Sequence, residues 1–162
     1  MRVEEIQKRL LQGLINVAQL LKKPVGSNHN YDVAEIINEK AADHIKGRII
    51  LTRTGQGILV QGKLTAELEL MCSRCLVLFP CPINFNIEEE FLPTLDIATG
   101  LPLYRPEDSE GFTIDSNNLL DLGELICQYI LLNLPMKPLC QPDCAGIKEV
   151  NHYGPSTEEK IS

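Results

Sequence analysis

Residues 58–75, ILVQGKLTAELELMCSRC, decide how this chain folds. From residue 64 to residue 70, apolar and polar side chains alternate. This period of two predicts a β-strand with one buried face and one exposed face. The strand leads directly into two cysteines separated by two residues, Cys72-Ser-Arg-Cys75. We therefore expect a sheet in which one strand delivers a pair of thiols at its end.

The neighbouring strands are predicted from the same alternation. Residues 48–54, the turn Gly55-Gln-Gly57 and residues 58–71 indicate a β-hairpin. Alternation resumes in residues 83–88 and predicts a further antiparallel strand that runs to about Phe91. The first cysteine pair then lies at a turn between two strands. This is the arrangement of a zinc knuckle, in which a tight turn directs backbone amides at the sulfurs.

A helix is expected at each end of this sheet region. Apolar residues recur at steps of three or four in residues 3–22, the period of an amphipathic helix, and Pro24 with Gly26 ends the pattern. The C-terminal half of this segment could instead be extended. The mixed residues 27–43 give little pattern, although Tyr31 and Val33 could open a strand.

The second helix is predicted over residues 118–133. Asp121 stands three residues before Glu124, the spacing of a capping box, and an apolar face follows. Prolines at positions 135 and 138 end the helix, and the chain then passes directly into Cys140. This helix should therefore position the second cysteine motif, Cys140-Gln-Pro-Asp-Cys144.

Together these elements predict an α+β fold. We expect an antiparallel β-sheet or a partly closed barrel with a zinc-knuckle-like strand turn, packed by an N-terminal and a C-terminal helix. Residues 1–147 are expected to form a single domain, because a chain of 162 residues can bury one sizeable core. Residues 92–118 should form an acidic surface loop, and the polar residues 148–162 a frayed tail.

Composition places the chain among globular proteins of a reducing compartment. Apolar residues make up 44% and charged residues 23%, and the apolar stretches fall short of a membrane span. The acidic start, Met1-Arg-Val-Glu-Glu5, does not suit a secretory signal. We expect a cytoplasmic protein, in which six cysteines serve as thiols or metal ligands rather than as disulfides.

Four of these cysteines form the candidate metal site. Two close pairs, Cys72 with Cys75 and Cys140 with Cys144, can each supply two ligands to a tetrahedral zinc ion. Such a site would be structural, with all four positions filled. The alternative is that these thiols are simply buried, since free cysteine packs like a small apolar residue. We assign Cys81 and Cys127 to that second class.

The charge distribution limits the nucleic-acid contacts that can be expected. A net charge of −7 argues against a protein that coats RNA indiscriminately. Residues 44–87 nevertheless carry a local excess of cations, whereas residues 88–125 are strongly acidic. Contacts to RNA or to a partner should therefore come from the first region. The candidates are Arg48, Arg53, Lys63 and Arg74. The alternative is that these cations are ordinary side chains on solvated strand faces.

Several motifs in order resemble one known family. A strand leading into CSRCL, a strand ending in EEEF, and then DLGELICQYILLNLPMKPLC and DCAG are similar to the YceD family. These bacterial and plastid proteins are named for the accumulation of large-subunit ribosomal RNA. The front segment VAQLLKKPVGS also looks like one branch of the family, so the resemblance covers roughly residues 17–146.

The resemblance carries specific residues with it. The matching positions are Cys72, Arg74, Cys75, Pro135, Cys140, Cys144 and Gly146. In the family, the cysteines among them look like metal ligands. This chain departs from its relatives because no cysteine follows Gly146, and because Cys127 and Gln128 stand where acidic residues are frequent.

The function implied by the resemblance is non-enzymatic. We expect a factor that supports large-subunit ribosomal RNA accumulation and ribosome assembly by binding precursor RNA, a ribosomal protein or both, without a small-molecule substrate. The alternative is a thiol-disulfide oxidoreductase that uses Cys72 and Cys75, although such pairs usually begin a helix. A hydrolase or nuclease is not expected, because His29, His44 and His152 lie in unrelated polar contexts.

Overall fold

The computed structural model describes residues 13–37, 44–105 and 110–147 of the chain. Its main element is a five-stranded sheet in the order β2-β3-β4-β5-β6. The strands are β2 (Asn28–Asp32), β3 (Ile45–Arg53), β4 (Ile58–Met71), β5 (Leu78–Pro93) and β6 (Thr113–Ile114). All neighbours pair antiparallel except β5 and β6, which are parallel. The expected α+β fold is confirmed, and the sheet is open rather than closed into a barrel.

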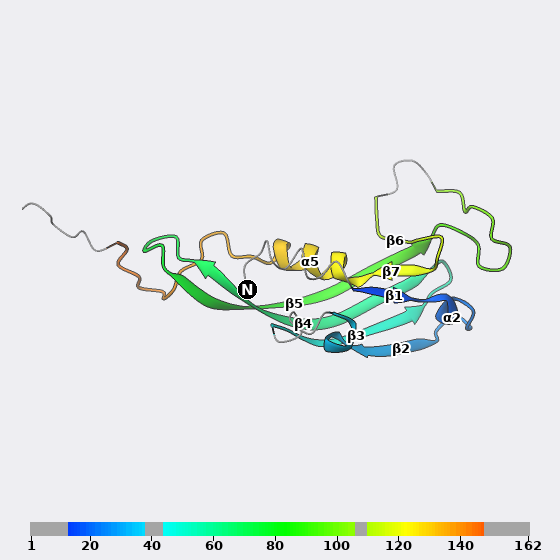
Figure 1. The fold of residues 1–162 in the computed structure, drawn as a ribbon, viewed down its shortest axis with the longest axis horizontal. Helices are drawn as coiled ribbons and strands as arrows, with labels where there is room; N and C mark the ends of the chain where they lie inside the picture. Colours follow the sequence, from blue (N-terminus) through cyan, green and yellow to red (C-terminus); the bar gives the residue numbers. More distant parts are fainter. Residues whose placement is uncertain (1–12, 38–43, 106–109, 148–162) are drawn as a thin grey trace, which may run out of the picture.

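The hairpin of β4 and β5 is the longest feature of the molecule (Figure 1). Its register runs from Ile58 opposite Phe91 to Met71 opposite Leu78, so the two strands stay paired up to the cysteine turn. Side chains along β4 alternate between buried and exposed, as predicted from the sequence. The β3–β4 hairpin is also confirmed, whereas β5 begins at Leu78, earlier than the alternation at residues 83–88 indicated.

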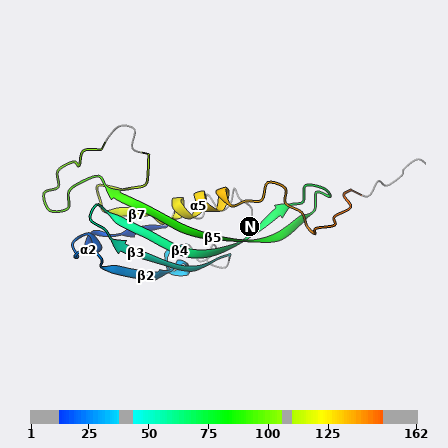
Figure 2. The same cartoon turned by 180° about the vertical axis from the view of Figure 1, so that it is seen from behind.

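Helix α5 (Leu122–Leu132) runs along β5, as both side views show (Figures 1 and 2). Its predicted N-cap is present, because the Asp121 carboxylate accepts a hydrogen bond from the Glu124 N–H at 2.9 Å. The Tyr129 hydroxyl donates to the Glu89 carboxylate at 3.0 Å and so ties the helix to β5. One face of the helix is fully buried in the core, through Leu122, Leu125, Ile126 and Ile130. Burial of this face against the sheet is the main source of the helix's stability.

The helix begins later than predicted. Residues 119–121 form a short strand, β7 (Leu119–Asp121), which pairs antiparallel with β1 (Leu14–Asn16) in a second, two-stranded sheet. The predicted helix start near residue 118 is therefore wrong, because strand β7 lies between that position and the first residue of the helix. The Asp121 side chain caps the helix at Glu124, so helical backbone starts only after it.

The predicted N-terminal helix is also corrected. Residues 3–12 of it lie outside the described residues, and the remainder forms strand β1 followed by a single helical turn, α2 (Ala18–Leu21). Where β1 ends and α2 begins, the side chain of Asn16 accepts a hydrogen bond from the Ala18 N–H at 3.0 Å. Leu14, an apolar residue within that predicted helix, is 51% exposed. Burial here alternates with period two, because β1 pairs with β7.

The remaining segments surround the sheet. Tyr31 lies in β2 as expected, but Val33 opens a second single-turn helix, α3 (Val33–Ile36). The expected loop at residues 92–118 is interrupted by β6, which pairs with the end of β5. The predicted tail at residues 148–162 lies outside the described residues. Within the described ranges, no helix has the length and apolar character to cross a bilayer.

Gly57 is where the β3–β4 turn comes closest to β5. A Cβ atom at Gly57 would lie 2.0 Å from the carbonyl oxygen of Phe91, whereas a Cβ at Gly55 in the same turn would meet nothing within 4 Å. We predict that Gly57→Ala lowers the free energy of unfolding by about 2 kcal/mol, because β5 must move. Gly55→Ala should change it by less than about 0.5 kcal/mol. Urea unfolding of both variants tests this, and equal stabilities would contradict the close approach.

Candidate metal centre

The first cysteine pair lies in the turn between β4 and β5. The Cys72 N–H donates to the Val77 carbonyl at 2.9 Å, and the Leu76 N–H donates to the Cys72 carbonyl at 3.0 Å. Leu76 has a positive φ of 61°, which reverses the chain within this short turn. The predicted knuckle-like strand turn is therefore present, and it holds Cys72 and Cys75 on the same side.

The second pair reaches this turn from the end of α5. Beyond the helix, the chain runs beside the turn, where the Pro138 carbonyl accepts a hydrogen bond from the Ser73 N–H at 2.8 Å. The Arg74 guanidinium donates to the Cys144 carbonyl at 2.9 Å. The contact from Ser73 was not predicted, because a bond between two backbone groups leaves no residue-type signal. These bonds hold the two segments together alongside the sulfurs.

Figure 1 shows this meeting point at the far end of the β4–β5 hairpin, where the segment after α5 comes beside the turn. The four sulfur atoms of Cys72, Cys75, Cys140 and Cys144 all lie within 4.8 Å of one another. The Cys72–Cys144 sulfurs are 3.7 Å apart, and the Cys75–Cys140 sulfurs are 3.6 Å apart. We call this group the cysteine clasp.

These distances fit a metal site better than a pair of disulfides. Four sulfurs placed tetrahedrally at about 2.3 Å from a zinc ion are about 3.8 Å from each other. A disulfide would need about 2.05 Å between the sulfurs, and all six cysteines of the chain are free. The donor set is four thiols with every position supplied by the protein. Such a set fits a closed, structural zinc site, the kind that cross-links a fold.

The environment of Cys72 favours its thiolate. Backbone N–H groups of Cys75 and Cys140 donate to its sulfur, and they lower the pKa from 9.0 to about 6 against the effect of burial. The turn therefore directs amides at a sulfur as expected for a knuckle. Cys72 is also fully buried, with 0% of its surface exposed. Its thiolate is stabilised but closed to solvent.

Two of the other thiols, Cys75 and Cys140, are held against ionisation by this arrangement. The neighbouring Cys75 thiol, burial and the Cys144 thiol raise the pKa of Cys140 to about 12. At Cys75, the Val77 amide favours the thiolate, but burial and the Cys72 thiol outweigh it and the pKa is raised. Several thiolates in one small volume repel one another. A divalent cation at the centre would remove that repulsion and allow all four to ionise.

The two remaining cysteines lie apart from the clasp. Cys81 is half-buried on β5, and Cys127 is half-buried on α5. Burial and the charge of Glu124 raise the pKa of Cys127. Neither belongs to the four-sulfur group, and the same holds for His29 and His44; His152 lies outside the described residues. The four cysteines that the sequence grouped by spacing are thus the ones that lie together, and Cys81 and Cys127 lie apart from them.

The clasp does not have the form of a redox-active pair. Cys72 and Cys75 lie in a turn between strands, and no helix of the described residues begins there. A helix N-terminus is what stabilises the attacking thiolate in such enzymes. The thiol with the lowered pKa, Cys72, is also the most buried of the four. The geometry therefore does not favour thiol-disulfide exchange.

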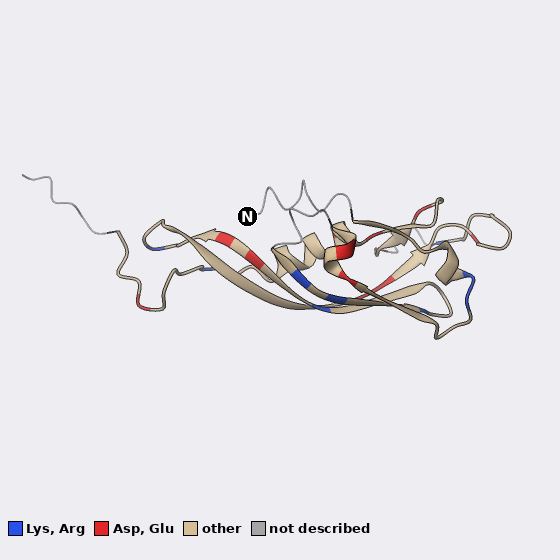
Figure 3. Ribbon diagram, turned by 60° about the horizontal axis from the view of Figure 1, so that its bottom comes forward, with Lys and Arg blue, Asp and Glu red and all other residues tan. Residues whose placement is uncertain are grey.

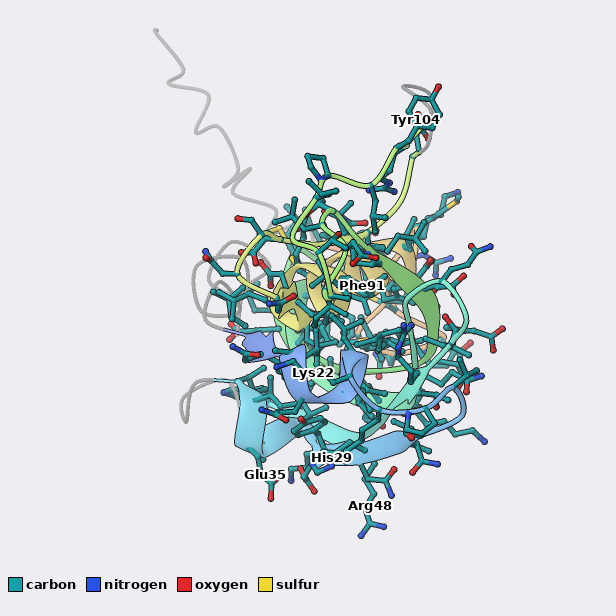
Figure 4. The ribbon with its side chains drawn as sticks, turned by 90° about the vertical axis from the view of Figure 1, so that its right-hand side faces the viewer. Lys22, His29, Glu35, Arg48, Phe91 and Tyr104 are labelled. Atoms are coloured by element: carbon teal, nitrogen blue, oxygen red, sulfur yellow. The ribbon has the colours of Figure 1, made fainter. Side chains whose placement is uncertain are left out.

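The four candidate contact cations do not share one surface. Arg48 and Lys63 lie opposite each other on β3 and β4, on the exposed face of the sheet. Lys and Arg residues on the middle of the sheet are visible in Figure 3, and Figure 4 shows Arg48 pointing away from the interior that Phe91 occupies. Together with Gln61, these two cations line a shallow depression.

Arg53 and Arg74 make contacts within the chain instead. The Arg53 guanidinium donates to the Leu21 carbonyl at 3.2 Å and to the Gly57 carbonyl at 3.0 Å. Arg74 donates to Cys144, as described above. Sequence reasoning could not separate these two roles, because backbone carbonyl acceptors can come from any residue type. Of the four candidates, only Arg48 and Lys63 lie side by side on the open sheet face.

Comparison with known proteins gives a family and a few relatives. Residues 60–161 match the family described as "Large ribosomal RNA subunit accumulation protein YceD". Uncharacterised proteins of Mycobacterium bovis and Mycobacterium tuberculosis are 32% identical over 95 residues, which cover 57% of this chain and 42% of theirs. One of Mycobacterium leprae is 26% identical over 92 residues, covering 57% of this chain and 40% of its own length.

The chain thus spans about two fifths of the length of these curated relatives. No solved structure matches it significantly. The family match nevertheless includes β5, α5 and all four residues of the cysteine clasp, and it extends over more than half of the sequence. The chain therefore belongs to the YceD family of large ribosomal RNA subunit accumulation proteins.

Proposed function

We propose that this chain supports the accumulation of large-subunit ribosomal RNA as a non-enzymatic binding factor, and that zinc closes its cysteine clasp. The family description supports the cellular role. The observation that carries the mechanism is the meeting of four sulfurs, from two segments far apart in sequence, within 4.8 Å of one another. A four-thiolate zinc site has no open position for a substrate or an activated water, which supports a structural role.

In this proposal the ligands are Cys72, Cys75, Cys140 and Cys144. The bound ion would supply a cross-link between the β4–β5 turn and the segment that follows α5. The protein itself contributes the Ser73–Pro138 and Arg74–Cys144 hydrogen bonds, which align the two segments before any ion binds. The clasp thereby fixes the hairpin relative to the helix, so that the surfaces on both keep one arrangement for a partner.

The partner in this proposal is precursor RNA, a ribosomal protein or both, in a cytoplasmic setting. The pair of Arg48 and Lys63 on the open sheet face could contact phosphate. Three exposed cations on this sheet face, Lys46, Arg48 and Lys63, make a small electrostatic footprint for RNA on a chain of net charge −7. An acidic factor complements the basic surface of a ribosomal protein more directly, which supports a protein contact.

Zinc binding should depend steeply on pH. The pKa of Cys72 is about 6, so this thiol is already ionised at pH 7, whereas Cys75 and Cys140 have raised pKa values and must lose protons. Because at least these two protons leave, the apparent affinity should rise roughly hundredfold per pH unit between pH 6.5 and 7.5. Below about pH 6, protonation of Cys72 should steepen the dependence further.

Competition with a chromophoric chelator of known pH dependence, at several pH values, measures this slope. Cys127→Ser provides the matched control, since Cys127 lies outside the clasp and its loss should leave the slope unchanged. Cys75→Ser should weaken binding at every pH. An affinity that does not change with pH, or one that Cys75→Ser leaves intact, would argue against a four-thiolate site.

The cellular role predicts a defect in ribosomal RNA. Deleting the gene should lower the ratio of large-subunit to small-subunit ribosomal RNA, because precursors that lack the factor are degraded. A restored gene with Cys127→Ser should recover the ratio, and one with Cys75→Ser should not. Quantitative RNA measurements in the four strains, with protein levels checked in parallel, test the proposal. An unchanged ratio in the deletion strain would reject the proposed function.

A further inference from the structure

Exposed apolar side chains gather around the cysteine clasp. Single exposed apolar residues are ordinary on protein surfaces, but a local group of them marks an interaction site. Five such side chains, which we call the clasp tip, are Met71 (53% exposed), Leu76 (56%), Val77 (56%), Leu78 (42%) and Met136 (101%). The first four flank or form the β4–β5 turn. Met136 stands two residues before Pro138, which is hydrogen bonded to that turn.

Leu76 adopts a backbone conformation that is unfavourable for leucine. Its φ of 61° is a left-handed conformation that glycine or asparagine adopts at lower cost than leucine. Buried packing could offset that cost, yet more than half of the side chain is exposed. Folding of this chain therefore gains little from a leucine here. An apolar contact with another molecule would account for its presence.

The clasp also makes the tip rigid. The Cys72 N–H bonds to the Val77 carbonyl, and the Leu76 N–H bonds to the Cys72 carbonyl, so both apolar side chains project from a fixed turn. A surface held in its binding conformation loses less entropy on association. The methionines add adaptable apolar surface, and apart from Met1 both methionines of the chain lie in the tip.

Charges behind the tip indicate what kind of partner fits. Glu67 and Glu69 are exposed on β4, where acidic residues mark the hairpin in Figure 3, and Asp143 is exposed between the second pair of cysteines. Lys137 and Arg74 offset two of these three negative charges, because the hydrogen bond of Arg74 to the neutral Cys144 carbonyl leaves its positive charge in place. A zinc ion with four thiolates would add two negative charges. With zinc bound, the region is therefore apolar at its centre and carries a net negative charge around it.

This chemistry fits a basic protein better than RNA. Phosphates would be repelled by the net negative charge of the zinc-loaded region, and the tip contains no aromatic side chain on which a base could stack. We propose that the clasp tip inserts into an apolar cleft bordered by lysine and arginine side chains on a protein of the large ribosomal subunit. The identity of that partner class rests on the proposed function, whereas the surface rests on exposure, backbone conformation and charge.

The test compares Leu76→Asn with Leu101→Asn. Asparagine tolerates a left-handed backbone, so Leu76→Asn should remove the apolar contact without lowering the unfolding temperature of the zinc-loaded protein. Leu101 is a matched control, because it is 64% exposed in the loop that follows β5. That loop lies at the opposite end of the molecule from the β4–β5 turn (Figure 1). Val77→Asn is a second tip variant that keeps the test decisive if Leu76→Asn misfolds.

The probes are the individual proteins extracted from purified, RNA-stripped large ribosomal subunits, together with free large-subunit RNA. By fluorescence anisotropy, at least one basic protein should bind the wild type, and tip variants should bind it at least about tenfold more weakly. Leu101→Asn should bind within about twofold of the wild type. Equal binding by the tip variants, or no binding of the wild type to any of these proteins, would overturn the inference.

Other occupants would appear as different outcomes. Loss of RNA binding, rather than protein binding, in the tip variants would assign the tip to RNA and overturn the proposal. A wild-type dimer that dissociates on Leu76→Asn in sedimentation velocity would assign it to self-association instead. In cells, full recovery of the ribosomal RNA ratio by the Leu76→Asn gene would reject the inference about the clasp tip but not the proposed function. An unchanged RNA ratio on gene deletion would reject the proposed function whatever the tip binds.

Discussion

The meeting of two cysteine pairs at one point is the constraint on which the rest of the molecule depends. Cys72 and Cys144 are separated by 72 residues, yet their sulfurs lie 3.7 Å apart. The long hairpin of β4 and β5 carries the first pair to the end of the sheet, and α5 with the segment after it carries the second pair to the same place. The length of β4 and β5 has its structural purpose here, since a shorter hairpin would end short of the second pair.

The parts that the sequence predicted are those set by local patterns. Period-two alternation located β4, and the spacing of the cysteines separated the clasp from Cys127. The sequence left residues 14–21 open between a helix and extended backbone, because their apolar positions suit both, and pairing with β7 makes residues 14–16 a strand. The roles of Arg53 and Arg74 were hidden for another reason: both donate to backbone carbonyls, which any residue supplies.

The surfaces of the molecule divide into regions of different chemistry. The clasp end combines exposed apolar side chains with carboxylates, and the open sheet face holds the neighbouring cations Arg48 and Lys63. Because the clasp joins hairpin and helix, it fixes the relative position of these regions. In this account, the metal contributes rigidity, and the chemistry of recognition belongs to the side chains around it. In the proposed function, recognition by these surfaces needs no reactive centre.

The most direct test of this account is zinc K-edge X-ray absorption on the protein purified without added metal. A four-thiolate clasp should hold one zinc ion per chain with four sulfur neighbours at about 2.3 Å and no nitrogen or oxygen ligand. If the purified protein contains no zinc, or if its zinc has only two sulfur neighbours, the four cysteines do not form one metal site. The link between hairpin and helix would then rest on the hydrogen bonds alone.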